Sequence, residues 1–120
     1  GIIDFYFACN DFFAYEIAIC INSICFDNNS TFNMTKAKNL IDGYSSIRAL
    51  SEDEKKYLPI LCMGAAMRFF LTRLYDFYNT DNKADVKIKD PFEYLKKIEF
   101  HSTIKNFNEY FIYYWMLYLI

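Results

Sequence analysis

The feature of this sequence that most constrains its fold is a run of apolar residues with helical spacing. Residues 12–26 contain no Gly or Pro, and apolar side chains recur there at steps of three and four. They are Phe13, Ile17, Cys20, Ile21 and Ile24. This spacing places them on one face of a helix, so we predict a first helix over residues 12–26 that buries this face. Asn10 or Asp11 is expected to be its N-cap.

A second helix is predicted after a polar loop. The side chains of residues 27–31 compete for backbone hydrogen bonds, so the chain should loop there. Thr35 is expected to cap a helix that begins at Lys36. The stripe that this helix should bury consists of Ala37, Leu40, Ile41 and Tyr44.

A third helical region opens with a capping-box sequence. Ser51 and Glu54 have the spacing at which each side chain bonds the other residue's backbone N–H. Pro59 has no N–H, so we predict a short helix, a break, and a long helix from Pro59 to Tyr78 at the centre of the core. The small residues that should admit a neighbouring helix closely are Gly64, Ala65 and Ala66.

The remaining helices are shorter. Polar residues 79–83 predict a loop, and Asp90 and Pro91 should open a helix whose Phe92, Leu95 and Phe100 pack inward. Residues 111–120 are almost wholly apolar but too few to cross a bilayer, which takes about 20 residues. We expect a short helix from Asn106 that docks on the protein, self-associates or adheres to a membrane surface; a frayed tail without a role is the alternative.

Composition excludes several function classes. Hydrophobic residues make up 54% and aromatic residues 21% of the 120 residues, which predicts one folded domain and excludes disorder. The aromatic excess fits either a surface that contacts a missing partner or the base composition of the genome. The net charge of −2 gives no basic field for nucleic acid.

The cysteines predict a reduced, cytoplasmic protein without a zinc site. Cys9, Cys20, Cys25 and Cys62 form no C-x-x-C pair, and His101 lies far from them in the sequence. Free cysteines in apolar surroundings behave as small hydrophobes. The chain begins with Gly1 and has no signal-peptide pattern, so it is expected to start inside something longer or to be processed.

Candidate site residues come from two places. Asp4 follows the β-branched Ile2 and Ile3, so it should lie at the end of a short strand over residues 1–4, where a carboxylate can face a cleft. Arg68 and Arg73 are five residues apart on the long helix. They are expected either to pack and pair with carboxylates such as Asp76 or to grip a substrate carboxylate through the planar guanidinium.

The motifs of residues 3–11, 18–22, 68–76 and 89–95 carry a family resemblance. They read IDFYFACND, AICIN, RFFLTRLYD and KDPFEYL. In this order they are similar to the bacterial homoserine kinases of the kinase-like type, within the aminoglycoside-phosphotransferase-like small-molecule kinases. The likeness covers residues 1–110 and leaves the tail at 111–120 outside it.

The resemblance implies a fold and a chemistry. The chain would be a mainly α portion of the C-terminal lobe of a protein-kinase-like α+β fold, with one short N-terminal strand. Asp4 would bind Mg²⁺ and, through it, ATP, while Asp11 and Glu16 would support the site. These kinases usually have Asp where this chain has Glu16, whose side chain is one methylene longer.

The parts that the sequence lacks limit what this chain can do alone. It has no Gly-rich phosphate loop and no His-x-Asp-x-x-x-x-Asn catalytic loop. It therefore looks like a portion of a kinase that phosphorylates L-homoserine with ATP, inactive alone, whose missing N-terminal portion could be a separate chain. The alternatives are a non-catalytic helical interaction module and a fragment of a choline or aminoglycoside kinase.

Overall fold

The described part of the chain is helical. The computed structural model describes residues 13–79 and 89–111. Within these ranges the elements are α1 (Phe13–Ile24), α2 (Met34–Ser45), α3 (Glu52–Asn79), α4 (Phe92–Ser102) and a 3-10 helix, η1 (Phe107–Phe111). They contain no strand, only an isolated antiparallel bridge between Phe26 and Phe32. The mainly α prediction is confirmed, whereas the strand predicted at residues 1–4 lies outside the described residues.

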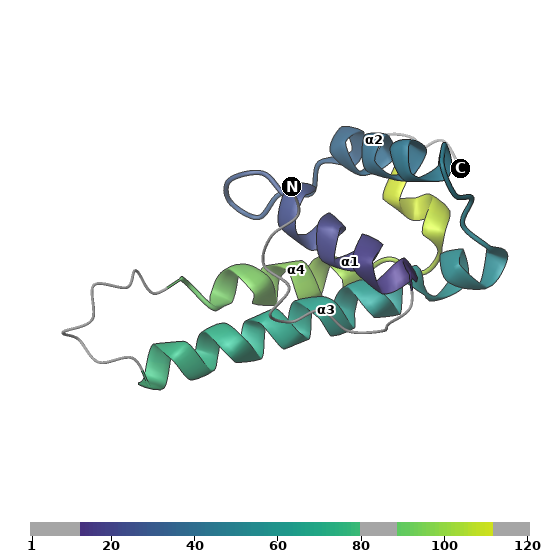
Figure 1. Cartoon of the computed structure of the whole chain (residues 1–120). Helices are drawn as coiled ribbons and strands as arrows, with labels where there is room; N and C mark the ends of the chain where they lie inside the picture. Colours follow the sequence, from purple (N-terminus) through teal and green to yellow (C-terminus); the bar gives the residue numbers. More distant parts are fainter. Residues whose placement is uncertain (1–12, 80–88, 112–120) are drawn as a thin grey trace, which may run out of the picture.

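The long helix α3 organises the other elements. Helix α4 lies beside it, α1 packs against it, and α2 and η1 lie together in a second layer (Figure 1). The buried residues of α1, α2 and α3 form one hydrophobic cluster that also contains Leu50 and Tyr110. This arrangement confirms the prediction that the helix in the third region is the centre of the core.

Helix α1 buries only part of the predicted face. Ile17 and Ile21 are buried as predicted, together with Ala14, Ala18 and Asn22. Cys20 is exposed, and so are Phe13 and Ile24, at 61% and 52%. The prediction selected the face with the bulkiest side chains. Because α3 packs closely against α1, small residues and one buried amide fit this contact better.

The first loop and helix α2 follow the prediction with a change of cap. The loop over residues 27–31 is confirmed, and Asn29 and Ser30 adopt positive φ there. The N-cap of α2 is Asn33 rather than Thr35, because the Asn33 side chain accepts a hydrogen bond from the Lys36 backbone N–H at 3.0 Å. Ala37 and Ile41 are buried as predicted.

Helix α3 starts with the predicted capping box but has no break. The Glu54 N–H donates to Ser51 Oγ at 3.1 Å, and the Ser51 N–H donates to Glu54 Oε1 at 3.0 Å. The predicted break at Pro59 is wrong, since α3 continues through it to Asn79. Proline inside a helix costs about 3 kcal/mol. Burial of Leu58, Pro59 and Cys62 on the inner face offsets this cost.

Two further packing predictions need correction. Ala65 and Ala66 are buried, but Gly64 faces solvent, and a Cβ built on it would meet nothing within 4 Å. Asp90 opens α4 by accepting a hydrogen bond from the Phe92 N–H at 2.9 Å, as expected. Phe92 itself is 58% exposed, however. Phe100 packs against the hydrophobic cluster as predicted, and Leu95 is half-buried. The fully buried residues of α4 are Tyr94, Lys97 and His101.

An aromatic cluster connects the two layers. Phe32 stacks on Phe100 with ring centroids 4.4 Å apart, and Phe26 meets Phe100 edge to face at 5.6 Å. Tyr110 of η1 lies 5.6 Å from Phe32. Aromatic pairs of this kind contribute about 0.5–1.5 kcal/mol each beyond their area burial. The loop that follows α1 is thereby fixed to α4 and η1.

One helix in the described ranges meets the length and composition criteria for crossing a membrane. Helix α3 has 28 residues and contains a window of mean hydropathy 1.2, of which 28% is buried. Central helices of soluble proteins meet the same criteria. Of the predicted terminal helix, η1 is seen, while residues 112–120 lie outside the described part.

The capping box provides a test of how α3 is held. We expect Ser51→Ala to lower the free energy of unfolding by about 1 kcal/mol, because it leaves the Glu54 N–H without its acceptor. Ser51→Asp keeps an acceptor and should stay within about 0.5 kcal/mol of the original chain. Urea unfolding followed by circular dichroism measures both. Equal stabilities of the two variants would contradict the role of the Ser51 side chain.

Candidate functional site

The predicted site residues fall into two groups in the structure. Asp4 and Asp11, the predicted metal ligand and supporting residue, lie outside the described residues. Glu16 lies in the first turn of α1 and is exposed. The neighbouring residue, Tyr15, contacts α3, because the Arg68 guanidinium donates to the Tyr15 hydroxyl at 3.4 Å. The structure therefore brings Arg68 to the end of α1 that carries Glu16.

Arg73 is engaged by the protein itself. Its Nη1 donates to Glu93 Oε2 at 2.7 Å and to the Asp90 carbonyl at 3.1 Å. The guanidinium lies 4.4 Å from the ring centroid of Tyr94. This confirms the packing and pairing interpretation for Arg73, with Glu93 rather than Asp76 as the partner. Binding of a substrate carboxylate by Arg68 or Arg73 stays a prediction.

The ion pair continues into a buried lysine. Glu93 Oε1 lies 3.2 Å from Lys97 Nζ, and only 4% of the Lys97 side chain is exposed. Burial alone raises the pKa of Glu93. The hydrogen bond from Arg73 and the charge of Lys97 together lower this pKa by more, so the net shift is downward. Burial lowers the pKa of Lys97. Lys97 also lies 4.2 Å from the ring centroid of Tyr94, which adds a cation–π contact.

A chain of buried hydrogen bonds runs from Lys97 to η1. Lys97 Nζ donates to the Asn22 carbonyl at 2.7 Å, and the Asn22 side-chain amide donates to the Cys62 carbonyl at 3.0 Å. The amide oxygen of Asn22 lies 2.7 Å from Nε2 of His101. Nδ1 of His101 lies 2.8 Å from the hydroxyl of Tyr110. We call Asn22, Cys62, Lys97, His101 and Tyr110 the buried polar network.

Hydrogen bonds and burial together assign the protonation state of His101. The amide oxygen of Asn22 can only accept, so Nε2 of His101 must donate to it. When the ring is neutral, Nδ1 accepts from the Tyr110 hydroxyl. Burial, assisted by the charge of Lys97, lowers the pKa of His101 from 6.5 to about 4. The network therefore needs a neutral imidazole.

The buried polar network was missed by sequence reasoning. From the sequence, His101 is weighed only against a metal site, and Asn22 is named only within a family motif. A signal was present, since Asn22 follows Ala14 and Ala18 at steps of four on the face that α1 buries. Polar residues at buried helical positions require partners. His101 could have been that partner, but no spacing in the sequence connects two residues 79 positions apart.

Two cysteines belong to the core, as predicted. Cys25 and Cys62 are fully buried, whereas Cys20 is exposed. Burial raises the pKa of Cys25 to about 11 and that of Cys62 to about 12. These thiols therefore stay protonated and unreactive at neutral pH. Cys9 lies outside the described residues.

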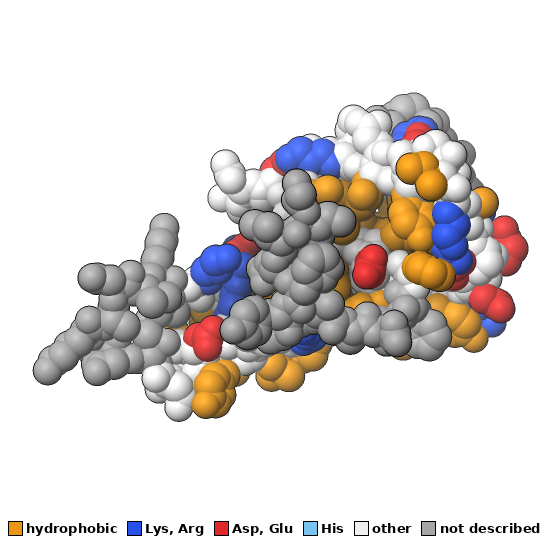
Figure 2. Space-filling model, in the orientation of Figure 1, with side chains coloured by type: hydrophobic (Ala, Val, Ile, Leu, Met, Phe, Trp, Pro, Cys, Tyr) orange, Lys and Arg blue, Asp and Glu red, His pale blue; other side chains and the backbone are white. Residues whose placement is uncertain are grey.

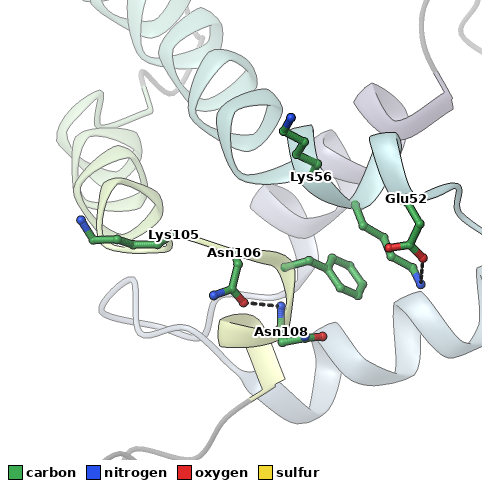
Figure 3. Close-up of a pocket in the computed structure, with 7 residues that line it drawn as sticks. Glu52, Lys56, Lys105, Asn106 and Asn108 are labelled. Carbon is green, nitrogen blue, oxygen red and sulfur yellow. Dashed lines mark hydrogen bonds and ion pairs between the residues drawn. The ribbon is translucent and has the colours of Figure 1, made fainter.

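A shallow cleft opens between the start of α3 and the segment before η1. It has a volume of about 470 Å³ and is lined by Glu52, Lys55, Lys56, Lys105, Asn106, Phe107 and Asn108. Figure 3 shows Glu52 and Lys56 opposite the segment of Asn106 and Asn108. Lys55 pairs with Glu52 at 3.4 Å, and the Asn108 N–H donates to Asn106 Oδ1 at 3.1 Å. These polar groups already have partners within the cleft.

The described residues do not themselves assemble a metal centre. Within residues 13–79 and 89–111, no group of three or more His, Cys, Asp or Glu side chains is placed to hold a metal ion. The predicted ligand, Asp4, is not in these ranges. What the described residues provide is a helical frame.

The amino-acid sequence is similar to part of one kind of enzyme. The chain is 56% identical over 110 residues to the homoserine kinase of Agrobacterium fabrum, a match that covers 92% of this chain and 34% of the relative. The homoserine kinase of Nitrobacter hamburgensis matches with the same identity and the same coverage. That of Gluconacetobacter diazotrophicus is 53% identical, again over 92% of this chain and 34% of the relative. The chain matches no protein-family model.

The chain is similar to part of these homoserine kinases over 92% of its length. It spans about a third of the length of the curated relatives that it matches. The resemblance read from the motifs is confirmed at this level.

The buried polar network predicts a pH dependence of stability. The pKa of His101 is lower in the folded chain, about 4, than its ordinary value of 6.5. The unfolded chain therefore binds more protons between these values, and stability falls as the pH drops from about 7 through 4, by about 3 kcal/mol in all. Denaturant unfolding at a series of pH values measures this loss.

The matched control is His101→Gln. Its amide can still donate to Asn22 and accept from Tyr110, but it does not titrate. We expect a lower stability at pH 7 and a flat profile between pH 5 and 7, where carboxylates contribute little. A profile for His101→Gln as steep as that of the original chain would show that the dependence has another source.

Proposed function

We propose that this chain is a portion of a homoserine kinase whose complete polypeptide transfers the γ-phosphate of ATP to the hydroxyl of L-homoserine, a step of threonine biosynthesis in the cytoplasm. The observation that carries the proposal is 56% identity to homoserine kinases over 92% of the chain. A protein-kinase-like C-terminal lobe is the fold that this proposal implies. The mainly helical frame agrees with it.

In this proposal Asp4 binds Mg²⁺, and Mg²⁺ holds the phosphates of ATP. The ion would supply neutralisation of the charge on the transferring phosphoryl group, which is the main requirement of this reaction. Asp11 and Glu16 would support the segment that carries Asp4. Helix α1 begins just after this segment, and Arg68 contacts Tyr15 in its first turn. The contact between α1 and α3 would thus hold the metal-binding segment in place.

The proposal predicts a low affinity of the isolated chain for ATP. Only one of the metal and phosphate contacts of such kinases is offered by its sequence, and catalysis and binding depend on several acting together. Calorimetric titration with Mg–ATP should show binding weaker than about 1 mM, or none. A micromolar affinity would show that the chain contains a more complete nucleotide site than proposed.

The function is tested in a chimera. The matched third of the Agrobacterium fabrum homoserine kinase is replaced by this chain, and ADP release is measured with homoserine, choline and an aminoglycoside. We expect activity that depends on homoserine. Activity with choline or an aminoglycoside alone would instead assign the chain to another small-molecule kinase.

Within the chimera, Asp4→Asn removes the charge proposed to bind Mg²⁺. We expect the rate to fall at least about a hundredfold, because electrostatic stabilisation supplies most of the rate in phosphoryl transfer. Asp27→Asn is the control, since Asp27 is an exposed carboxylate in the loop after α1 that pairs with Lys36 at 2.9 Å. A fall of the same size for both variants would remove Asp4 from the metal site.

A helical interaction module without catalysis is the second candidate. The observation in its favour is the number of large apolar side chains that α3 exposes, including Ile60, Leu71 and Tyr78. Such a surface marks a contact site whether or not the bound partner is catalytic. The chimera separates the two, since a folded chimera without homoserine-dependent activity would favour the module.

A further inference from the structure

The face of α3 that points away from the core carries an uninterrupted apolar repeat. Seven positions alternate at steps of three and four along the helix: Tyr57, Ile60, Gly64, Met67, Leu71, Leu74 and Tyr78. We call these residues the outer stripe. Alternating steps of three and four give the average of 3.5 residues with which one helix packs along another.

Six of the seven residues of the outer stripe are exposed, and Leu74 is half-buried. Ile60 is 65% exposed, Leu71 53% and Tyr78 76%. In Figure 2 hydrophobic side chains gather along the lower edge of the molecule, where Figure 1 places α3. The opposite side of the helix carries the buried Leu58, Cys62 and Ala65. Helix α3 therefore has two apolar faces, of which the described structure covers one.

The chemistry of the outer stripe selects an apolar helix as the partner. Residues 57–67 contain no charged side chain. The space above Gly64 is empty, because a Cβ there would meet nothing within 4 Å, so another backbone can approach closely. A polar partner would leave its groups without hydrogen bonds on this surface.

Charge disfavours a second copy of the same chain. A parallel pair of α3 helices would bring two acidic first turns together, each with Glu52, Asp53 and Glu54. An antiparallel pair in register on the stripe would centre near Met67 and bring the two Arg68 side chains near one another. Both symmetric arrangements therefore place like charges side by side, at a cost in stability.

We propose that the outer stripe is the interface for a helix from the two thirds of homoserine kinase that this chain does not match. The relatives are about three times as long as the matched segment, which is 34% of their length. An apolar face 22 residues long, from Tyr57 to Tyr78, requires cover in a stable protein. This inference rests on the proposed function, since the partner is the remainder of that enzyme.

The test compares the same substitution in two settings. Leu71→Glu and Met67→Glu are introduced into the isolated 120-residue chain and into the chimera with the Agrobacterium fabrum kinase. In the isolated chain the side chains are exposed, so Tm should change by less than about 2 °C. In the chimera the new carboxylate would be buried without a partner, and Tm should fall by more than about 5 °C.

The control is Thr72→Glu. Thr72 is exposed, lies beside Leu71 and is not part of the outer stripe. The same charge at this position should leave Tm within about 2 °C in both settings. A drop for Thr72→Glu as large as that for Leu71→Glu would contradict the inference.

Other outcomes separate this inference from the proposed function. A chimera that phosphorylates homoserine but tolerates Leu71→Glu would overturn the interface and leave the function standing. A folded, inactive chimera that loses stability with Leu71→Glu would support the interface and overturn the proposed function. An isolated chain that sediments as a dimer and becomes a monomer with Leu71→Glu would assign the outer stripe to a second copy. A chimera that does not fold would contradict both the interface and the proposed function.

Discussion

The hydrogen bonds of one buried imidazole hold the described helices together. His101 of α4 donates to Asn22 of α1 and accepts from Tyr110 of η1, at 2.7 and 2.8 Å. Asn22 in turn bonds the Cys62 carbonyl in α3. Because these groups are shut off from water, each needs its partner, and loss of one would leave others unsatisfied. The apolar cluster supplies most of the stabilisation, while the polar network selects one arrangement of its helices.

The same network has consequences for the start of α1. Asn22 fixes the C-terminal half of this helix, and the hydrogen bond from Arg68 to Tyr15 fixes its first turn to α3. The segment that carries Asp4 immediately precedes α1 in the sequence. A rigid helix is a better support for a metal ligand than a loop, because positional errors of about 1 Å already reduce catalysis. Under the function proposed above, α1 would give such support to the segment that carries Asp4.

Helix α3 is packed against other helices on one face and is mostly exposed on the opposite face. The inner face of α3 meets α1 and α4, whereas six of the seven residues of its outer stripe are exposed in the described structure. A chain that matches a third of a longer enzyme would show this asymmetry, since helices at the centre of a larger lobe are apolar on several faces. The high aromatic content, which the sequence alone could also assign to genome composition, is in part located on this stripe.

Local patterns in the sequence determined the helices, the capping box and the loop at residues 27–31, because spacing of three and four and local hydrogen bonds act over a few residues. Motif likeness to a known family identified the homology. Tertiary packing decided the rest. Because of this packing, α3 continues through Pro59, and α1 buries Ala18 and Asn22 rather than Phe13. Packing also brings His101 to Asn22, which is 79 positions away in the sequence. Such choices depend on which surfaces meet in space, and no local spacing encodes that.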